Sequence, residues 1–117
     1  MKRCFSLKRN KEFKRVYRAG KAQKCRSAVL LYTRGRHDSL RVGISVSKRL
    51  GNSVARNRIK RRLRAAIDCN FDRIAHGWNL VFIAREKAKD ERFELLVSDV
   101  SGLLEKANLI AELGAKR

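Results

Sequence analysis

The residues of this sequence whose types and spacing could do chemistry are cations, and they gather between Lys48 and Arg64. The stretch holds eight basic side chains and no Asp or Glu. These are Lys48, Arg49, Arg56, Arg58, Lys60, Arg61, Arg62 and Arg64. Six of the eight are Arg, whose planar guanidinium group suits phosphate oxygens and base edges. The stretch contains no carboxylate that could neutralise them as surface pairs. The pattern therefore predicts an anion-binding surface.

The same stretch has the apolar spacing of a helix. Either Asn52 or Ser53, directly after Gly51, can cap a helix that runs to about residue 70. Its apolar stripe consists of Ala55, Ile59, Leu63, Ala66 and Ile67. At about 100° per residue, the polar positions fall into three groups around this stripe. They are Lys60 and Arg64 on one flank, Arg58 and Arg62 on the other, and Asn57 and Arg61 facing outward. Such a helix could contact two nucleic-acid surfaces at once.

The sequence lacks the side-chain clusters with which proteins hold metal ions or cut bonds. A protein nuclease with paired metal ions needs several close Asp, Glu or His residues. Asp68 and Asp72 stand four residues apart, and we interpret them as a solvated helix end. The two histidines, His37 and His76, have no neighbouring Cys or His in the sequence. The three cysteines, Cys4, Cys25 and Cys69, are widely spaced and form no C-x-x-C pair. We expect no catalytic residue, no protein metal ligand, and reduced thiols in a cytoplasmic protein.

The charge is large and unevenly distributed. The chain has a formal net charge of +19, from 30 Lys and Arg against 11 Asp and Glu. Residues 1–67 carry 22 basic and 2 acidic side chains, a net +20, whereas residues 68–117 carry 8 and 9, a net −1. A polyanion relieves such self-repulsion, so the first half should supply most of the binding surface. No signal peptide is recognisable, and no apolar run approaches the roughly 18 residues of a membrane span, so we expect no membrane association.

The remaining patterns predict one α+β domain over residues 1–117, with a basic arm at 1–9 and a flexible tail at 114–117. Asn10 can cap a helix over 11–19, and Asp90 can cap a last helix. Residues 27–33 and 40–46 read as strands that form a hairpin, and residues 78–84 as a central strand covered on both faces. The order is α-β-β-α-β-α, with a single small sheet packed by helices.

The apolar residues of the first predicted helix allow two interpretations. Phe13, Val16 and Tyr17 fall at i, i+3 and i+4 on one face. Periodicity alone favours a plain contact between this helix and the sheet. Exposed aromatic side chains on the same face would instead offer stacking platforms for unpaired bases.

The ordered motifs of the chain resemble one known family. The stretch VSKRLGNSVARNRIKRRLR, residues 46–64, is similar to the signature of the bacterial ribonuclease P protein, whose hallmark Arg-Asn-Arg tripeptide stands here as Arg56, Asn57 and Arg58. Further matches are F-x-x-V-Y at 13–17, the strand ending in Leu31, Tyr32 and Thr33, RVGISVSK at 41–48 and FIARE at 82–86. The matches cover most of the chain in order, which makes them specific.

This resemblance implies both topology and function. It implies a left-handed β-α-β crossover, which sequence pattern alone would reject because such crossovers are right-handed in about 98% of cases. It also implies the protein subunit of a ribonucleoprotein endonuclease, a hydrolase of tRNA processing that removes the 5′ leader from precursor tRNA. In that family the catalytic RNA performs the hydrolysis with bound magnesium, and one protein per RNA assists it.

The resemblance further assigns two groups of residues. Those expected to face the catalytic RNA are Lys48, Arg49, Arg56, Asn57, Arg58 and Arg61. Those expected to line the cleft for the single-stranded leader are Phe13, Tyr17, Leu30 and Tyr32, with Lys60 and Arg64 at its rim. Val16 stays in the core.

Three other functions remain open at this point. A ribosomal protein or general RNA chaperone would also be small and basic, but would not need the Arg-Asn-Arg helix. A DNA-binding protein reading the major groove would need one exposed recognition face, which a buried stripe with two basic flanks suits less well. A metal-dependent protein nuclease acting alone would need the missing ligand cluster.

Overall fold

The computed structural model describes residues 6–7, 10–36 and 39–111. Its helices and strands are α1 (Asn10–Ala19), β1 (Lys21–Lys24), β2 (Ala28–Arg34), β3 (Leu40–Ser45), α2 (Ser53–Asn70), β4 (Trp78–Ala84) and α3 (Phe93–Lys106). Short 3-10 helices precede α2 and α3, namely η2 (Lys48–Leu50) and η4 (Glu86–Lys89). The predicted tail at 114–117 and most of the arm at 1–9 lie outside the described residues.

One four-stranded mixed sheet forms the centre of the molecule, in the order β1-β2-β4-β3. β4 pairs antiparallel with β2, from Ala28 opposite Ala84 to Arg34 opposite Trp78, and parallel with β3. The predicted α+β class and the central position of residues 78–84 are confirmed. The predicted hairpin between residues 27–33 and 40–46 is wrong, because β4 inserts between those two strands. The strand at 21–24 was not predicted; only four residues long, it has no apolar alternation.

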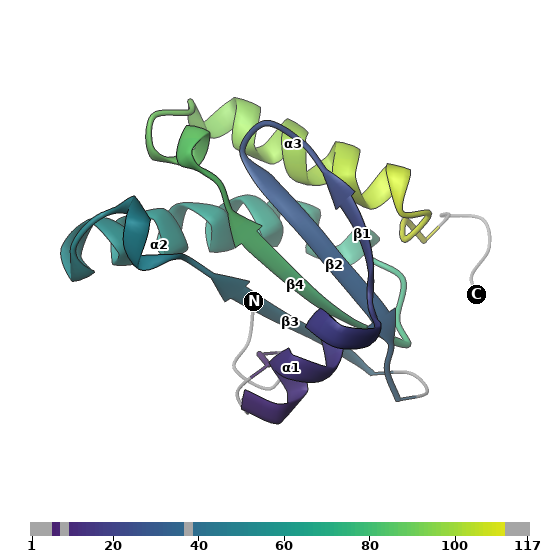
Figure 1. Cartoon of the computed structure of the whole chain (residues 1–117). Helices are drawn as coiled ribbons and strands as arrows, with labels where there is room; N and C mark the ends of the chain where they lie inside the picture. The colour runs from purple at the N-terminus through teal and green to yellow at the C-terminus, as the bar shows by residue number, and fades with distance from the viewer. Residues whose placement is uncertain (1–5, 8–9, 37–38, 112–117) are drawn as a thin grey trace.

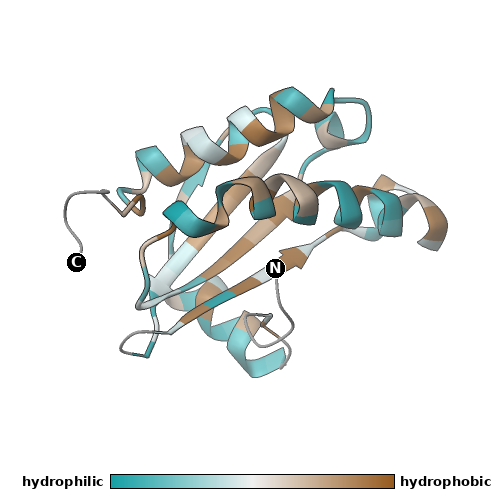
Figure 2. Ribbon diagram, turned by 180° about the vertical axis from the view of Figure 1, so that it is seen from behind, coloured by the Kyte–Doolittle hydropathy of each residue, from teal (hydrophilic) through white to brown (hydrophobic). Residues whose placement is uncertain are grey.

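The β3-α2-β4 unit joins two neighbouring parallel strands through a helix. Figure 2 views the sheet with α2 in front of it, and with the strands turned to point upward β4 lies to the left of β3. The crossover is therefore left-handed, as the family resemblance implies. The usual preference for right-handed crossovers does not hold here.

Helices cover both faces of the sheet, and strand alternation divides the apolar residues between two cores. α2 and α3 lie on one face and α1 on the other (Figure 1). The larger core, on the α2 and α3 side, includes Leu30, Leu63, Phe82 and Leu103. The smaller one joins Leu7, Val16 and Val81, with Phe13, Leu31 and Ile83 packed against it. β2 and β4 thus send alternate side chains to different helices.

Local capping explains where α2 begins. The Asn52 side chain accepts a hydrogen bond from the backbone N–H of Ala55 at 2.9 Å, so Asn52 is the cap and Ser53 opens the helix. Gly51 precedes it with φ of 136°, a conformation that other residues rarely adopt. At α3 the predicted cap is wrong: Asp90 ends η4, and Arg92 occupies the cap position. No helix among the described residues has the length and apolar character needed to cross a membrane.

Candidate nucleic-acid interface

A groove runs along β3 at the edge of the sheet, between α1 and α2. It encloses about 230 Å³ and is lined by Ser6, Leu7, Phe13, Val42, Gly43, Ile44, Lys60 and Arg64. Because β3 is an edge strand, side chains from both faces of the sheet meet around it. The segment before α1 pairs with β3 beside the groove, since the Leu7 backbone N–H donates to the Val42 carbonyl at 2.9 Å. The groove thus combines an apolar floor with a cationic rim.

The floor depends on a glycine in β3. Gly43 points toward α1, and a β-carbon built there would lie 2.6 Å from Cζ of Phe13 and 3.2 Å from Cβ of Leu7. Only a residue without a side chain lets the Phe13 ring rest directly on the β3 backbone. Phe13 is half-buried by this contact, while Tyr17, one turn later, is 46% exposed. This face of α1 therefore both packs against the sheet, through Phe13, and carries an exposed aromatic side chain, Tyr17.

The structure brings together some of the predicted leader-cleft residues and separates others. Phe13, Lys60 and Arg64 line the groove, and Tyr17 lies on the same helix. Leu30 and Tyr32 are 0% and 6% exposed and belong to the core under α2 and α3, on the opposite face of the sheet from α1. Their placement in the same cleft as Phe13 was wrong. The β2 residues that do pack toward α1 are the odd-numbered ones, such as Leu31.

The residues predicted to face the catalytic RNA lie on η2 and the first turns of α2. Lys48, Arg49, Asn57, Arg58 and Arg61 are all exposed. Within the part of the chain that the structure describes, the ion pairs join other residues. They are Arg26 with Glu91, Arg73 with Glu105, Lys89 with Glu86, and Arg92 with Glu94. This segment is therefore a cationic surface without carboxylate partners among those residues.

Arg56 holds a more constrained position in that segment. Its side chain is half-buried, and its Nε donates to the Gly51 carbonyl at 3.1 Å. The bond fixes the turn between η2 and α2, while the terminal nitrogens of the guanidinium remain for a ligand. Arg56 thus positions the two halves of the cationic surface relative to each other.

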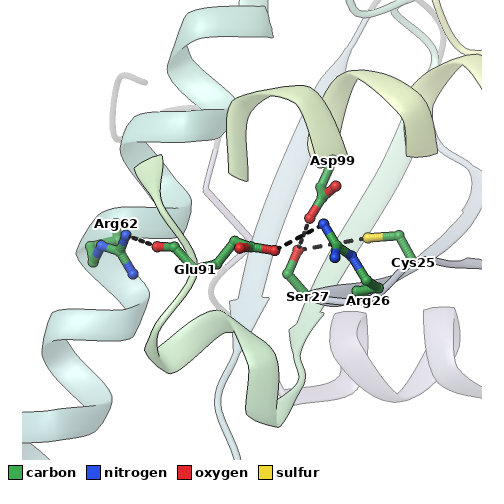
Figure 3. Close-up of polar contacts among 6 residues, drawn as sticks. All are labelled: Cys25, Arg26, Ser27, Arg62, Glu91 and Asp99. Carbon is green, nitrogen blue, oxygen red and sulfur yellow. Dashed lines mark hydrogen bonds and ion pairs between the residues drawn. The ribbon is translucent and has the colours of Figure 1, made fainter. Parts of the chain in front are cut away.

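Arg62, on the other flank of α2, binds within the protein. Its guanidinium donates to the backbone carbonyl of Ala88 at 3.0 Å. It also donates to the backbone carbonyl of Glu91 (Figure 3). Farther along the same network, the buried Glu91 carboxylate pairs with Arg26 at 3.4 Å. The helical wheel predicted this flank correctly, but it could not show that a neighbouring segment covers it.

The network around Glu91 extends to the start of β2 and to α3. The buried Ser27 hydroxyl donates to Asp99 at 2.7 Å, and the Cys25 thiol lies 3.7 Å from the same hydroxyl (Figure 3). These contacts tie the segment after β4 to α2, α3 and β2. The long-range contacts among them were not foreseen from the sequence, because their partners are between 26 and 72 positions apart.

No group of three or more His, Cys, Asp or Glu side chains is placed to hold a metal ion among the described residues. At the other end of the sheet, the Arg34 guanidinium lies 4.9 Å from the centre of the Trp78 ring, which makes an edge contact with Tyr32. This cation–π contact is an internal one between paired strands.

Comparison with known proteins identifies the family. The family model described as Ribonuclease P matches residues 1–108. The Ribonuclease P protein component of Clostridium novyi (strain NT) is 40% identical over 111 residues, covering 93% of this chain and 98% of that protein. The corresponding protein of Shouchella clausii (strain KSM-K16) is 38% identical over 118 residues, covering 100% of this chain and 97% of that protein.

Solved structures agree with the fold. The RNase P protein of Staphylococcus aureus superimposes with a TM-score of 0.80 at 33% identity, covering 90% of this chain and 96% of that one. The RNase P protein from Thermotoga maritima gives 0.78 at 26% identity, covering 86% and 96%. With the family model, the curated relatives and the fold all in agreement, this chain belongs to the bacterial ribonuclease P protein component family.

Proposed function

We propose that this protein binds the RNA subunit of ribonuclease P through η2 and the outward face of α2, and holds the single-stranded 5′ leader of precursor tRNA in the groove beside β3. Membership of the family makes it the protein component of a ribonucleoprotein endonuclease of tRNA processing. The two surfaces adjoin along α2, so one protein could contact both RNAs at the same time.

Exposure and charge support the assignment of the RNA-subunit surface. Arg58, Asn57 and Arg61 project from a well-capped helix of 18 residues, which holds them in a fixed arrangement. Lys48 and Arg49 extend the surface across the turn that Arg56 fixes. Folded RNA is recognised largely through its backbone and shape, and a rigid helix carrying planar guanidinium groups suits that task.

The groove has the chemistry that unpaired RNA requires. Proteins bind single strands with aromatic platforms for the bases and cations for the backbone, and each stack is worth roughly 1–3 kcal/mol. Here Phe13 and the neighbouring exposed Tyr17 supply the aromatic groups, and Lys60 and Arg64 supply the cations. Leu31 and Ile83 support the helix that carries the aromatic residues and replace Leu30 and Tyr32 in this proposal.

In this proposal the protein binds and orients RNA and makes no catalytic contact with the reacting phosphodiester. The RNA subunit would hold magnesium ions, which supply charge stabilisation and an activated water for hydrolysis. The protein's side chains would align the leader relative to that RNA, which raises the rate by positioning. One protein per RNA in the bacterial cytoplasm completes the proposal.

The observation that carries the proposal is that Phe13 from α1 and Lys60 and Arg64 from α2 line one groove. These residues lie far apart in the chain, and two helices on opposite faces of the sheet bring them to the same strand. A purely structural helix-to-sheet contact would not need cations at its rim.

Reconstitution with bacterial ribonuclease P RNA at low magnesium tests the function. Addition of the purified protein should restore cleavage of precursor tRNA, because bound protein cations replace part of the counterion requirement. Arg58→Ala should weaken binding to the RNA subunit by roughly 1–3 kcal/mol, the usual loss for a charge-assisted contact. Lys87→Ala, a change at an exposed cation of η4, is the matched control and should bind as the parent does.

The groove is tested separately with substrates. Tyr17→Ala should weaken the binding of precursor tRNA that carries a leader and leave the binding of mature tRNA unchanged. Equal losses of affinity for the two tRNAs would contradict the leader assignment. Cleavage by RNA-free protein would point to a nuclease acting alone. Equal affinity for ribosomal RNA or duplex DNA would favour the other two alternatives.

A further inference from the structure

The outer face of α1 carries a second cationic surface, separate from the groove and from α2. Lys11, Lys14, Arg15 and Arg18 are all exposed, and with Ala19 they border an open hollow of about 390 Å³. The proposed function uses none of these four residues. The surface is called the α1 stripe below.

Helix geometry places the α1 stripe directly opposite the groove-facing side of α1. At about 100° per residue, its four cations fall within an arc of about 100°, roughly 180° from the midpoint between Phe13 and Val16. Val16 is fully buried against the sheet. The single acidic residue of the helix, Glu12, lies outside this arc. At about 1.5 Å per residue, the stripe extends for about 10 Å along the helix.

The α1 stripe opposes the stability of its own helix. Lys11 and Arg15, and likewise Lys14 and Arg18, are like charges at i,i+4, a spacing at which cations repel. A helix of ten residues is marginal in isolation, so burial of Val16 and Phe13 must hold α1 in place. Four like charges in this arrangement lower the stability of the helix, and the ion pairs between described residues join other side chains. A bound polyanion would compensate for this repulsion.

We propose that the α1 stripe binds the phosphate backbone of double-stranded RNA. Among the residues that the structure describes, Ala19 is the only apolar one that borders the hollow, so these residues offer no platform on which unpaired bases could stack. Double-stranded RNA is contacted mainly through its backbone, since its deep groove is closed to side chains. The exposed aromatic residue of this helix, Tyr17, lies outside the arc on the groove side. α1 would therefore separate a single strand in the groove from a duplex on its outer face.

The test compares two triple variants of the full-length protein. The first, Lys14→Gln with Arg15→Gln and Arg18→Gln, removes three cations of the α1 stripe and keeps good helix formers. The control, Lys87→Gln with Lys89→Gln and Arg92→Gln, removes three exposed cations between β4 and α3, at the far end of the molecule from α1 (Figure 1). Both lower the net charge equally. Affinity is measured for a two-turn RNA duplex and for one of its separated strands, from about 0.05 to 0.2 M salt.

The α1 variant should bind the duplex roughly tenfold to a hundredfold more weakly than the control near 0.15 M salt. With three phosphate contacts removed, binding releases fewer counterions from the RNA. Its plot of log affinity against log salt should be less steep by about 2. The loss of affinity for the separated strand should be at least threefold smaller than the loss of affinity for the duplex. Thermal unfolding should show an unchanged or higher Tm, because repulsive pairs are removed.

Two results would overturn the proposal. The first is duplex affinity and salt slope equal to those of the control variant. The second is an equal loss on duplex and single strand, which would mean that the α1 stripe does not distinguish them. Neither result depends on the groove or on α2, whose variants Tyr17→Ala and Arg58→Ala test the proposed function separately.

Discussion

Arg62 lies in the most basic stretch of the chain, and the structure predicts that its replacement will damage folding more than RNA binding. Its guanidinium donates to the carbonyls of Ala88 and Glu91, which holds the segment between β4 and α3 against α2. Arg61, its neighbour in sequence, is exposed on the outward face. The same substitution at both positions, Arg62→Met and Arg61→Met, keeps a long side chain with good helix propensity and removes every donor.

The magnitude follows from the two bonds. A hydrogen bond to a charged group contributes about 1.5–3 kcal/mol, and both acceptors belong to residues that are buried in the folded protein. Part of this is offset because Arg62 is only half-buried and water can reach the site. We expect Arg62→Met to lower the free energy of unfolding by about 2–3 kcal/mol. At about 4 °C per kcal/mol for a domain of this size, Tm should fall by about 8–12 °C.

Thermal and urea unfolding, followed by circular dichroism on the free protein, measure this loss. Arg61→Met should change stability by less than about 0.5 kcal/mol, as surface substitutions usually do. At a temperature where both variants are folded, Arg61→Met should show the larger loss of affinity for the RNA subunit. An Arg62→Met variant with the Tm of the parent, or with an RNA affinity as low as that of Arg61→Met, would contradict this structural role of Arg62.

Three further predictions concern the groove, the core and the helix cap. Gly43→Ala places a β-carbon against Phe13, so it should cost about 1–3 kcal/mol in urea unfolding and weaken binding of leader-bearing precursor tRNA, with mature tRNA as the comparison. Leu30→Ala should cost about 2–5 kcal/mol in urea unfolding because the side chain is fully buried, and should leave the ratio of precursor to mature tRNA affinity unchanged. Asn52→Ala removes the bond to the Ala55 N–H and should lower the free energy of unfolding by about 1 kcal/mol, measured in the same way.

The local elements of this fold could be predicted from the sequence, but their pairing could not. Period and caps located α2 and the strands at 40–46 and 78–84 to within a residue or two. The prediction of the pairing failed because the short connection between β2 and β3 suggested a hairpin. Instead β4, which begins 33 residues after the end of β3, lies between these two strands and pairs with both. Strand order depends on which helices cover which face, and apolar runs such as that of β4 fit any central position.

Only some of the residues predicted for the leader cleft line the groove, and the reason is again that the sequence does not show which face of the sheet a strand residue points to. The wheel of α2 placed Lys60 and Arg64 on one flank, and both line the groove. Leu30 and Tyr32 were assigned to it from family resemblance, but the β2 register sends even-numbered side chains toward α2 and α3. A shift of one position along a strand changes the face, so a resemblance that fixes the strand does not fix its orientation. The role of Gly43 could have been suspected, because a glycine inside an apolar strand often marks close approach of another group.

The division of charge between the halves of the chain has a structural counterpart. Among the described residues after position 67, five of the six Lys and Arg have an intramolecular partner: Arg73, Arg85, Lys89, Arg92 and Lys106. Two of them, Arg85 and Lys106, donate to the carbonyls of Cys25 and Lys24, where β1 turns into β2. Arg85 and Lys106 thus stabilise the sheet, while the exposed cations of α1, η2 and α2 lie at the surface on either side of β3. Arg62 differs from the exposed cations of α2, because its guanidinium donates to the backbone carbonyls of Ala88 and Glu91 in the carboxyl-terminal half.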